Sequence, residues 1–240
     1  MSDLMSVEDW LFIPGTLCDG RVFAPLLDHL GDTVSGTVRL VGSLDDDDLS
    51  ALARHIVQGL GPRIRVVGFS LGCQVAFEIM RQASDRCVGV TLISSTARPD
   101  LPDLAPDRRA MVERFERDGA EALIDADLWP RYVADPERPE HPVHDIVRAM
   151  ARETSNANFA AQIELAISRP DSRPVLSWSD APVLMINGRQ DRLTPVEFGA
   201  EIVGAARNGT HKVIPDAGHF VLLEQPEAVA LAIRDWIRRV

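Results

Sequence analysis

The sequence predicts an α/β fold in which a mostly parallel sheet carries helices on both faces. Short apolar runs bounded by Gly, Pro or Asp recur along the chain, and amphipathic stretches with helical spacing separate them. This alternation favours parallel pairing, because parallel strands need a long crossover, usually a helix. The predicted strands are 10–13, 38–41, 64–69, 88–93, 183–186 and 212–214, and the predicted helices are 21–30, 48–60, 72–83, 196–206 and 224–239.

One long segment, 97–179, interrupts the alternation. It contains no convincing strand, carries many of the prolines and has apolar pairs at helical spacing, such as Met111 with Phe115. Because it is too long for a plain loop, we expect a helical insertion above the strand C-termini, where a cap or lid would lie. The sequence thus predicts a sheet domain formed by 1–96 and 180–240, and a helical cap formed by 97–179.

Composition excludes several classes of protein. With 240 residues, 45% of them apolar, the chain can form a core by packing alone. Its formal net charge is 25 − 36 = −11, which would repel a nucleic-acid backbone. No apolar run approaches the about 20 residues that span a bilayer, and no basic segment precedes an apolar stretch at the N-terminus, so no membrane contact or export is expected. Cys18, Cys73 and Cys87 are scattered and odd in number, which favours a cytoplasmic location over a disulfide framework.

The acidic run 45–48 raises the question of a cation site. It precedes apolar residues at helical spacing, so we interpret it as a solvated helix N-terminus, where the helix dipole favours negative charge. Calcium loops need spaced ligands and a turn glycine rather than a block of carboxylates. No metal is therefore expected.

A Gly-x-Ser-x-Gly pattern occupies 68–72, with Ser70 at its centre. It lies between the predicted strand 64–69 and the predicted helix 72–83. This context is typical of a nucleophile elbow, in which the glycines make room for a tight turn that presents the serine hydroxyl. The helix that begins behind Ser70 would direct its free N–H groups toward an oxyanion formed there.

A serine nucleophile needs a base, and the base needs a carboxylate that orients it. Asp191 follows the predicted strand 183–186 and His219 follows the predicted strand 212–214. Ser70, Asp191 and His219 therefore all fall at strand C-termini, where an open α/β sheet builds its site. Asp216 is the alternative carboxylate, although it fits better as a turn residue. A Cys18–histidine pair is a weaker alternative because no elbow surrounds the cysteine.

Three motifs, in this order, resemble those of the α/β-hydrolase superfamily: Gly-Phe-Ser-Leu-Gly at 68–72, Asn-Gly-Arg-Gln-Asp at 187–191 and Ala-Gly-His-Phe at 217–220. The resemblance covers nearly the whole chain and is nearest to small bacterial esterase-like members with a helical cap. It implies a Ser-His-Asp triad and an acyl-enzyme intermediate, and it implies no cofactor.

The resemblance also implies an oxyanion hole made by two backbone N–H groups, that of Leu71 and one from the loop after an early strand. The family commonly has His-Gly in this loop, whereas the sequence here is Ile-Pro-Gly-Thr at 13–16. Thr16 is the expected donor, with Leu17 as the alternative if the loop is shifted by one residue. Because the first strand would begin near Val7, the hairpin that usually opens the fold is expected to be absent. About six strands would remain, with an edge for which a second copy of the chain, forming a homodimer, is a candidate partner.

Substrate choice is expected to depend on the cap. Trp129, Tyr132 and Phe159, together with Leu17, are candidate substrate-binding residues, although most large side chains at helical spacing simply pack a cap onto its body. We expect hydrolysis of a small-molecule acyl substrate, either an ester, a thioester or a lactone. C–C bond cleavage, acyl transfer or a cofactor-free reaction on the same triad is the alternative, and a ligand-binding protein without turnover is a weaker one.

Overall fold

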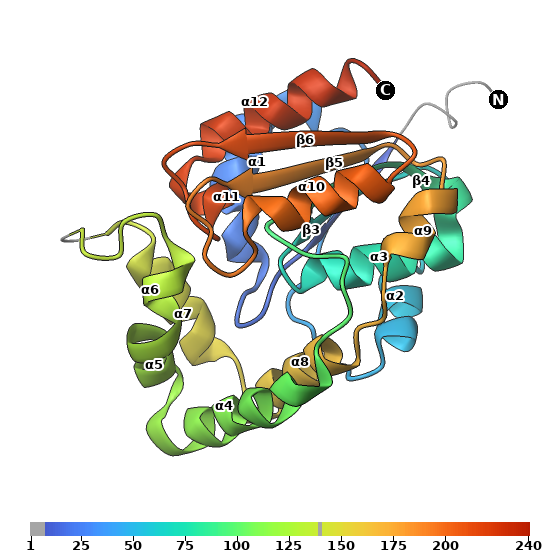
Figure 1. Ribbon diagram of the computed structural model, residues 1–240. Helices are drawn as coiled ribbons and strands as arrows, with labels where there is room; N and C mark the ends of the chain where they lie inside the picture. Colours follow the sequence, from blue (N-terminus) through green and yellow to red (C-terminus); the bar gives the residue numbers. More distant parts are fainter. Residues whose placement is uncertain (1–7, 139–140) are drawn as a thin grey trace.

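Six parallel strands form a sheet in the order β2-β1-β3-β4-β5-β6 (Figure 1). The computed structural model describes residues 8–138 and 141–240, so the predicted start of the first strand near Val7 lies outside the described residues. Each predicted strand is present, which confirms the fold class. The strands are β1 (Asp9–Ile13), β2 (Val38–Leu40), β3 (Ile64–Phe69), β4 (Cys87–Ile93), β5 (Val183–Gly188) and β6 (Gly209–Ile214).

Two hydrophobic clusters, one on each face of the sheet, hold the helices against it. Trp10 and Phe12 belong to the cluster that includes α1 and α12, whereas Leu11 and Ile13 belong to the cluster that includes α2 and α3. Successive residues of a strand face opposite sides, so a strand covered on both sides is apolar throughout. One face carries α1 (Ala24–Leu30) and α12 (Pro226–Ile237); the other carries α2 (Leu49–Ile56), α3 (Gly72–Ala83), α9 (Arg173–Trp178) and α10 (Val196–Ala205).

One predicted helix is divided in the structure, and a short helix precedes another. The segment predicted as 21–30 contains a 3₁₀ helix, η1 (Gly20–Phe23), followed by α1, and the C-terminal segment contains α11 (Val221–Glu224) followed by α12. Pro25 and Pro226 lie in the first turns of α1 and α12. Proline fixes φ near the helical value and lacks an N–H, so it suits the start of a helix and ends the preceding one. Three further 3₁₀ turns are η2 (Gly31–Thr33), η3 (Ser84–Arg86) and η4 (Pro102–Leu104).

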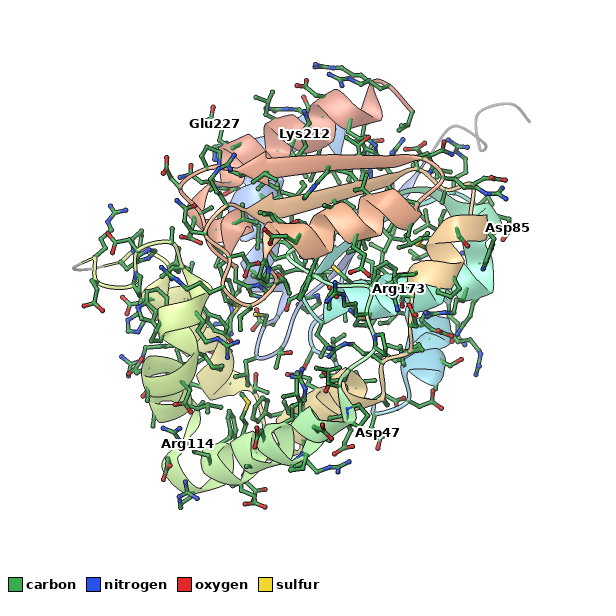
Figure 2. All side chains as sticks on the ribbon, viewed as in Figure 1. Asp47, Asp85, Arg114, Arg173, Lys212 and Glu227 are labelled. Carbon is green, nitrogen blue, oxygen red and sulfur yellow. The ribbon has the colours of Figure 1, made fainter. Side chains whose placement is uncertain are left out.

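The acidic run 45–48 lies at the beginning of α2, as predicted. The Asp48 side chain accepts hydrogen bonds from the backbone N–H groups of Ser50 and Ala51, at 2.8 and 3.0 Å. Asp47 lies at the outer surface of the molecule (Figure 2). The run therefore caps a helix.

The segment predicted as a cap is helical, and its described residues form no strand. Figure 1 shows α4 to α8 together below the sheet, whereas α9 lies beside α3 and α10. Val175 and Leu176 of α9 join the core cluster of the sheet. The division at 97–179 stays a prediction. The helices are α4 (Ala105–Asp118), α5 (Ala120–Leu123), the π turn η5 (Ile124–Leu128), α6 (Trp129–Tyr132), α7 (His144–Glu153) and α8 (Asn156–Ser168).

Candidate active site

Ser70 occupies a tight turn between β3 and α3. Its φ is 51°, a left-handed conformation that non-glycine residues rarely adopt and that surrounding contacts must hold. The Ser70 N–H donates to the Ile93 carbonyl at 2.9 Å, and the Ser95 hydroxyl donates to the Ser70 carbonyl at 3.0 Å. Ile93 is the last residue of β4, the neighbouring strand, and Ser95 lies just beyond it. The strand-turn-helix arrangement expected at 68–72 is therefore present.

Both glycines of this turn are required because backbone atoms crowd them. A Cβ atom at position 68 would lie 2.9 Å from the Cα of Cys73. One at position 72 would clash with the Ile13 carbonyl oxygen and lie 2.6 Å from that of Pro14. The start of α3 thus packs directly on the loop after β1, and this packing sets the distance between the two loops.

Replacing Gly72 by alanine is expected to destabilise the protein by about 1–3 kcal/mol, since the added methyl group must displace backbone on both sides. Urea unfolding measures this effect. Gly204, an exposed glycine of α10, is the matched control, because no atom lies within 4 Å of a Cβ placed there. Gly204→Ala should keep or raise stability, since alanine favours a helix. Equal unfolding midpoints for the two variants would contradict the close packing at position 72.

The structure brings Ser70, His219 and Asp191 together, as their positions at strand ends predict. His219 follows β6, and its Nε2 lies 2.9 Å from Ser70 Oγ. Its Nδ1 lies 3.0 Å from Oδ2 of Asp191, which follows β5. His219 and Asp191 are only 4% and 5% exposed. With the Nδ1 proton donated to Asp191, Nε2 is left free to accept the Ser70 hydroxyl proton.

Four hydrogen bonds surround the Asp191 carboxylate. Besides His219, it accepts from the Leu193 N–H at 2.8 Å, the Thr194 N–H at 2.9 Å and the Thr194 hydroxyl at 2.6 Å. Burial on its own would raise the pKa of Asp191, but the charge and hydrogen bond of His219 and the Thr194 bonds outweigh it, so the pKa is lowered. Thr194 was missed in the sequence; the local pattern there predicts only that an Asp side chain accepts from the backbone N–H two residues on, as Asp191 does from Leu193.

The loop after β1 runs beside Ser70, since a Cβ on Gly15 would lie 2.9 Å from the Cβ of Ser70. The N–H groups of Thr16 and Leu71 have no acceptor within 8–138 and 141–240. The Leu17 N–H, in contrast, donates to Oε1 of Gln162, a residue of α8, at 2.9 Å. Of the two amides considered for this loop, only that of Thr16 remains open to a ligand.

Glu224, at the end of α11, is a site residue that the sequence did not reveal. Its two carboxylate oxygens accept from the Gly218 N–H at 2.7 Å and from the Ala134 N–H at 2.8 Å. It thereby ties the loop of His219 to the segment after α6. Burial raises the pKa of Glu224 above its ordinary value. The only signal in the sequence is a single acidic residue after a run of four apolar ones.

Of the three aromatic residues proposed to bind substrate, Tyr132 lies against His219. Its ring stacks on the His219 imidazole, with centroids 6.0 Å apart and planes at 19°. Trp129 packs within the cap, where its indole N–H donates to the Pro136 carbonyl. Phe159 is fully buried against Phe115, with ring centroids 4.7 Å apart. The structure therefore brings Tyr132, but neither of the other two, into contact with His219.

The alternative residues occupy unsuitable surroundings. Burial raises the pKa of the Cys18 thiol, and its Sγ contacts the Thr16 carbonyl at 3.3 Å. Asp216 is exposed and has a φ of 54°, as in a turn. In the described part of the chain, no group of three His, Cys, Asp or Glu residues is arranged to hold a metal ion. No helix in that part is long and apolar enough to cross a membrane.

The chain is similar to known proteins in both sequence and structure. Residues 6–232 match the sequence model of the alpha/beta hydrolase family. A thermophilic esterase from Thermogutta terrifontis has a similar structure, with a TM-score of 0.87, 28% identity, and coverage of 98% of this chain and 90% of that chain.

Two known proteins are similar to this chain in sequence. The biotin biosynthesis bifunctional protein BioHC of Cellvibrio japonicus is 26% identical over 240 residues, which cover 94% of this chain and 47% of that protein. The chain thus spans about half the length of this relative. A pimeloyl-[acyl-carrier protein] methyl ester esterase of Neisseria meningitidis is 26% identical over 199 residues, which cover 80% of this chain and 77% of that protein.

Proposed function

The chain belongs to the alpha/beta hydrolase family, and on that premise we propose that it is a serine hydrolase acting on a small carboxylic ester, thioester or lactone. One observation carries the proposal: Ser70 Oγ, His219 and Asp191 form a continuous hydrogen-bonded line, with distances of 2.9 and 3.0 Å. Such a line activates a serine hydroxyl that is otherwise a weak nucleophile. The esterase names of two similar proteins support ester chemistry.

In the proposed reaction, His219 removes the Ser70 proton as Oγ attacks the acyl carbonyl carbon. The N–H groups of Leu71 and Thr16 stabilise the oxyanion of the tetrahedral intermediate. His219 then donates its proton to the leaving group as the carbon–oxygen or carbon–sulfur bond breaks, which leaves the acyl group on Ser70. A water molecule, activated by His219, releases the acid and restores the serine.

The surroundings of His219 favour an uncharged acyl group. The rings of Phe69, Tyr132 and Phe220 lie against its imidazole, with centroids 5.4, 6.0 and 6.0 Å away. Aromatic walls exclude water, which strengthens the hydrogen bonds of the triad and disfavours a charged substrate group beside it. We therefore propose a small-molecule acyl substrate with an apolar group next to the carbonyl.

Labelling with a fluorophosphonate, followed by hydrolysis of p-nitrophenyl esters of increasing acyl length, tests the proposal. We expect one label per chain on Ser70, and turnover of the short esters. Mass spectrometry locates the label and absorbance follows the turnover. Labelling without turnover of any ester would overturn ester hydrolysis in favour of C–C cleavage or acyl transfer, and absence of labelling would overturn the nucleophile itself.

Two further proposals concern the cellular location and the oligomeric state of the protein. A cytoplasmic location is supported by three buried, free cysteines. A homodimer stays a prediction. β2 is one of the two edge strands of the sheet, and Val38 and Leu40 on it are 45% and 43% exposed.

A further inference from the structure

A cap side chain enters the loop that would form the oxyanion hole. Gln162 of α8 is completely buried, and its Oε1 accepts the Leu17 N–H at 2.9 Å although the two residues are 145 positions apart. Its Nε2 lies 3.4 Å from Ser43 Oγ, in the loop after β2. A buried amide side chain needs such partners, because an unpaired one is costly. Gln162 therefore joins the cap to two loops of the sheet domain.

The Leu17 backbone needs this support. Its φ is 56°, in the left-handed region that a leucine rarely adopts without contacts that hold it. A Cβ on Gly15, two residues earlier, would lie 2.9 Å from the Cβ of Ser70, so a change of the turn at Leu17 would move the loop beside the nucleophile. The Thr16 N–H, between these two residues, has no acceptor among the described residues.

The position of Gln162 is set by the cap. Phe159, one turn earlier on α8, packs on Phe115 of α4, with ring centroids 4.7 Å apart. Just beyond the end of α8, Arg169 forms an ion pair of 2.7 Å with Asp100, whose side chain is 2% exposed. Contacts on both sides of Gln162 thus fix this part of α8 to the cap and its connection, and the hydrogen bond from Leu17 to Gln162 forms with the cap in this position on the sheet domain.

We propose that Gln162 is a positioning residue of the oxyanion hole. By accepting the Leu17 N–H, its carbonyl oxygen holds the loop in the turn that directs the Thr16 N–H to the oxyanion, so seating of the cap completes the site. This inference rests on the proposed function. The alternative is that the Leu17 N–H is the donor to the oxyanion. Gln162 Oε1 would then occupy the place of the substrate oxygen and block the site.

The test compares Gln162→Met, which keeps the length but removes the acceptor, with Gln162→Glu, which keeps an oxygen acceptor at the same reach. Asn158→Ala is the control, because Asn158 lies on the same helix and approaches Ser43 at 3.5 Å but not Leu17. We expect Gln162→Met to lower kcat about 10- to 100-fold with KM within about twofold, and Gln162→Glu to restore most of it. Asn158→Ala should match the wild type.

A transition-state analogue separates positioning from general damage to the structure. A boronic acid that forms a tetrahedral adduct on Ser70 should bind Gln162→Met less tightly by the same factor as the loss of kcat. If Gln162→Met does not fold, Gln162→Asn, which withdraws the amide by one methylene group, should show the same loss. A kcat equal to that of Asn158→Ala, or higher than wild type, would overturn the inference.

The Ser70→Ala variant shows whether a negative result rejects only the role of Gln162 or the proposed function as well. If Ser70→Ala retains esterase activity, the proposed function is wrong. If Ser70→Ala is inactive and Gln162→Met nevertheless equals the control, the triad stands and only the role of Gln162 is rejected.

Discussion

Ser70→Ala is expected to lower kcat for the best p-nitrophenyl ester on the order of 10⁶-fold, because removal of the nucleophile of a triad leaves only binding and the oxyanion hole. Folding should be unaffected. The backbone bonds that hold the turn, to Ile93 and from Ser95, do not involve the Ser70 hydroxyl. Steady-state kinetics, together with a thermal unfolding midpoint for the same preparation, measure both quantities.

Ser177→Ala is the matched control, since Ser177 lies exposed on α9 and its hydroxyl donates only to the Pro174 carbonyl. It should retain full activity. Loss of fluorophosphonate labelling in Ser70→Ala but not in Ser177→Ala would assign the label. A Ser70→Ala enzyme that still hydrolyses the ester would show that another group carries the reaction.

The sequence could predict the elbow and the grouping of Ser70, Asp191 and His219 because their determinants are local. Crowding at positions 68 and 72 needs glycine, and this requirement leaves a readable pattern. Parallel strands end at one edge of a sheet, so residues that follow β3, β5 and β6 meet there. These inferences needed only the glycine pattern and the order of strands and helices.

The contacts of Gln162 and Glu224 that join distant parts of the chain could not be predicted, because each has a partner far away in the sequence. Oε1 of Gln162 meets a backbone N–H 145 residues distant, and Oε2 of Glu224 meets one 90 residues distant. Both partners are backbone amides, which carry no residue-specific signal. In the sequence, Gln162 is only one polar residue within an apolar stretch, and Glu224 is only one acidic residue after such a stretch.

For the aromatic residues of the cap, the sequence predicts burial but not which other residues they contact. Helical spacing indicates that a side chain is on an apolar face, but it does not say whether that face meets the site or another cap helix. Tyr132 meets His219, whereas Phe159 meets Phe115, and both are almost completely buried. Only the three-dimensional packing separates these two situations.

Asp191→Asn is expected to lower kcat about 10⁴-fold while the site keeps its shape. The asparagine carbonyl can still accept from the N–H groups of Leu193 and Thr194, which hold the side chain in place. Its NH₂ group, however, would donate to Nδ1 of His219. The imidazole then carries its proton on Nε2, where it faces Ser70 and cannot act as a base.

Asp216→Asn is the control for this prediction, because Asp216 lies three residues before His219 and is the alternative carboxylate. It is exposed, and asparagine tolerates its φ of 54° as well as aspartate does. Asp216→Asn should therefore keep wild-type kcat. A large loss in Asp216→Asn, with little loss in Asp191→Asn, would exchange the roles of the two acids.

Stability against pH gives an independent measurement on the same variants. The pKa of Asp191 is lowered in the folded protein, so its charged form stabilises the fold above the pKa of the unfolded chain, about 3.9. That contribution is lost as the pH falls through the folded pKa. The difference in unfolding midpoint between wild type and Asp191→Asn should therefore be largest near neutral pH and shrink in acid. A difference that stays constant down to strongly acidic pH would mean that Asp191 gains no stabilisation from its charge, and would remove the electrostatic basis for its role beside His219.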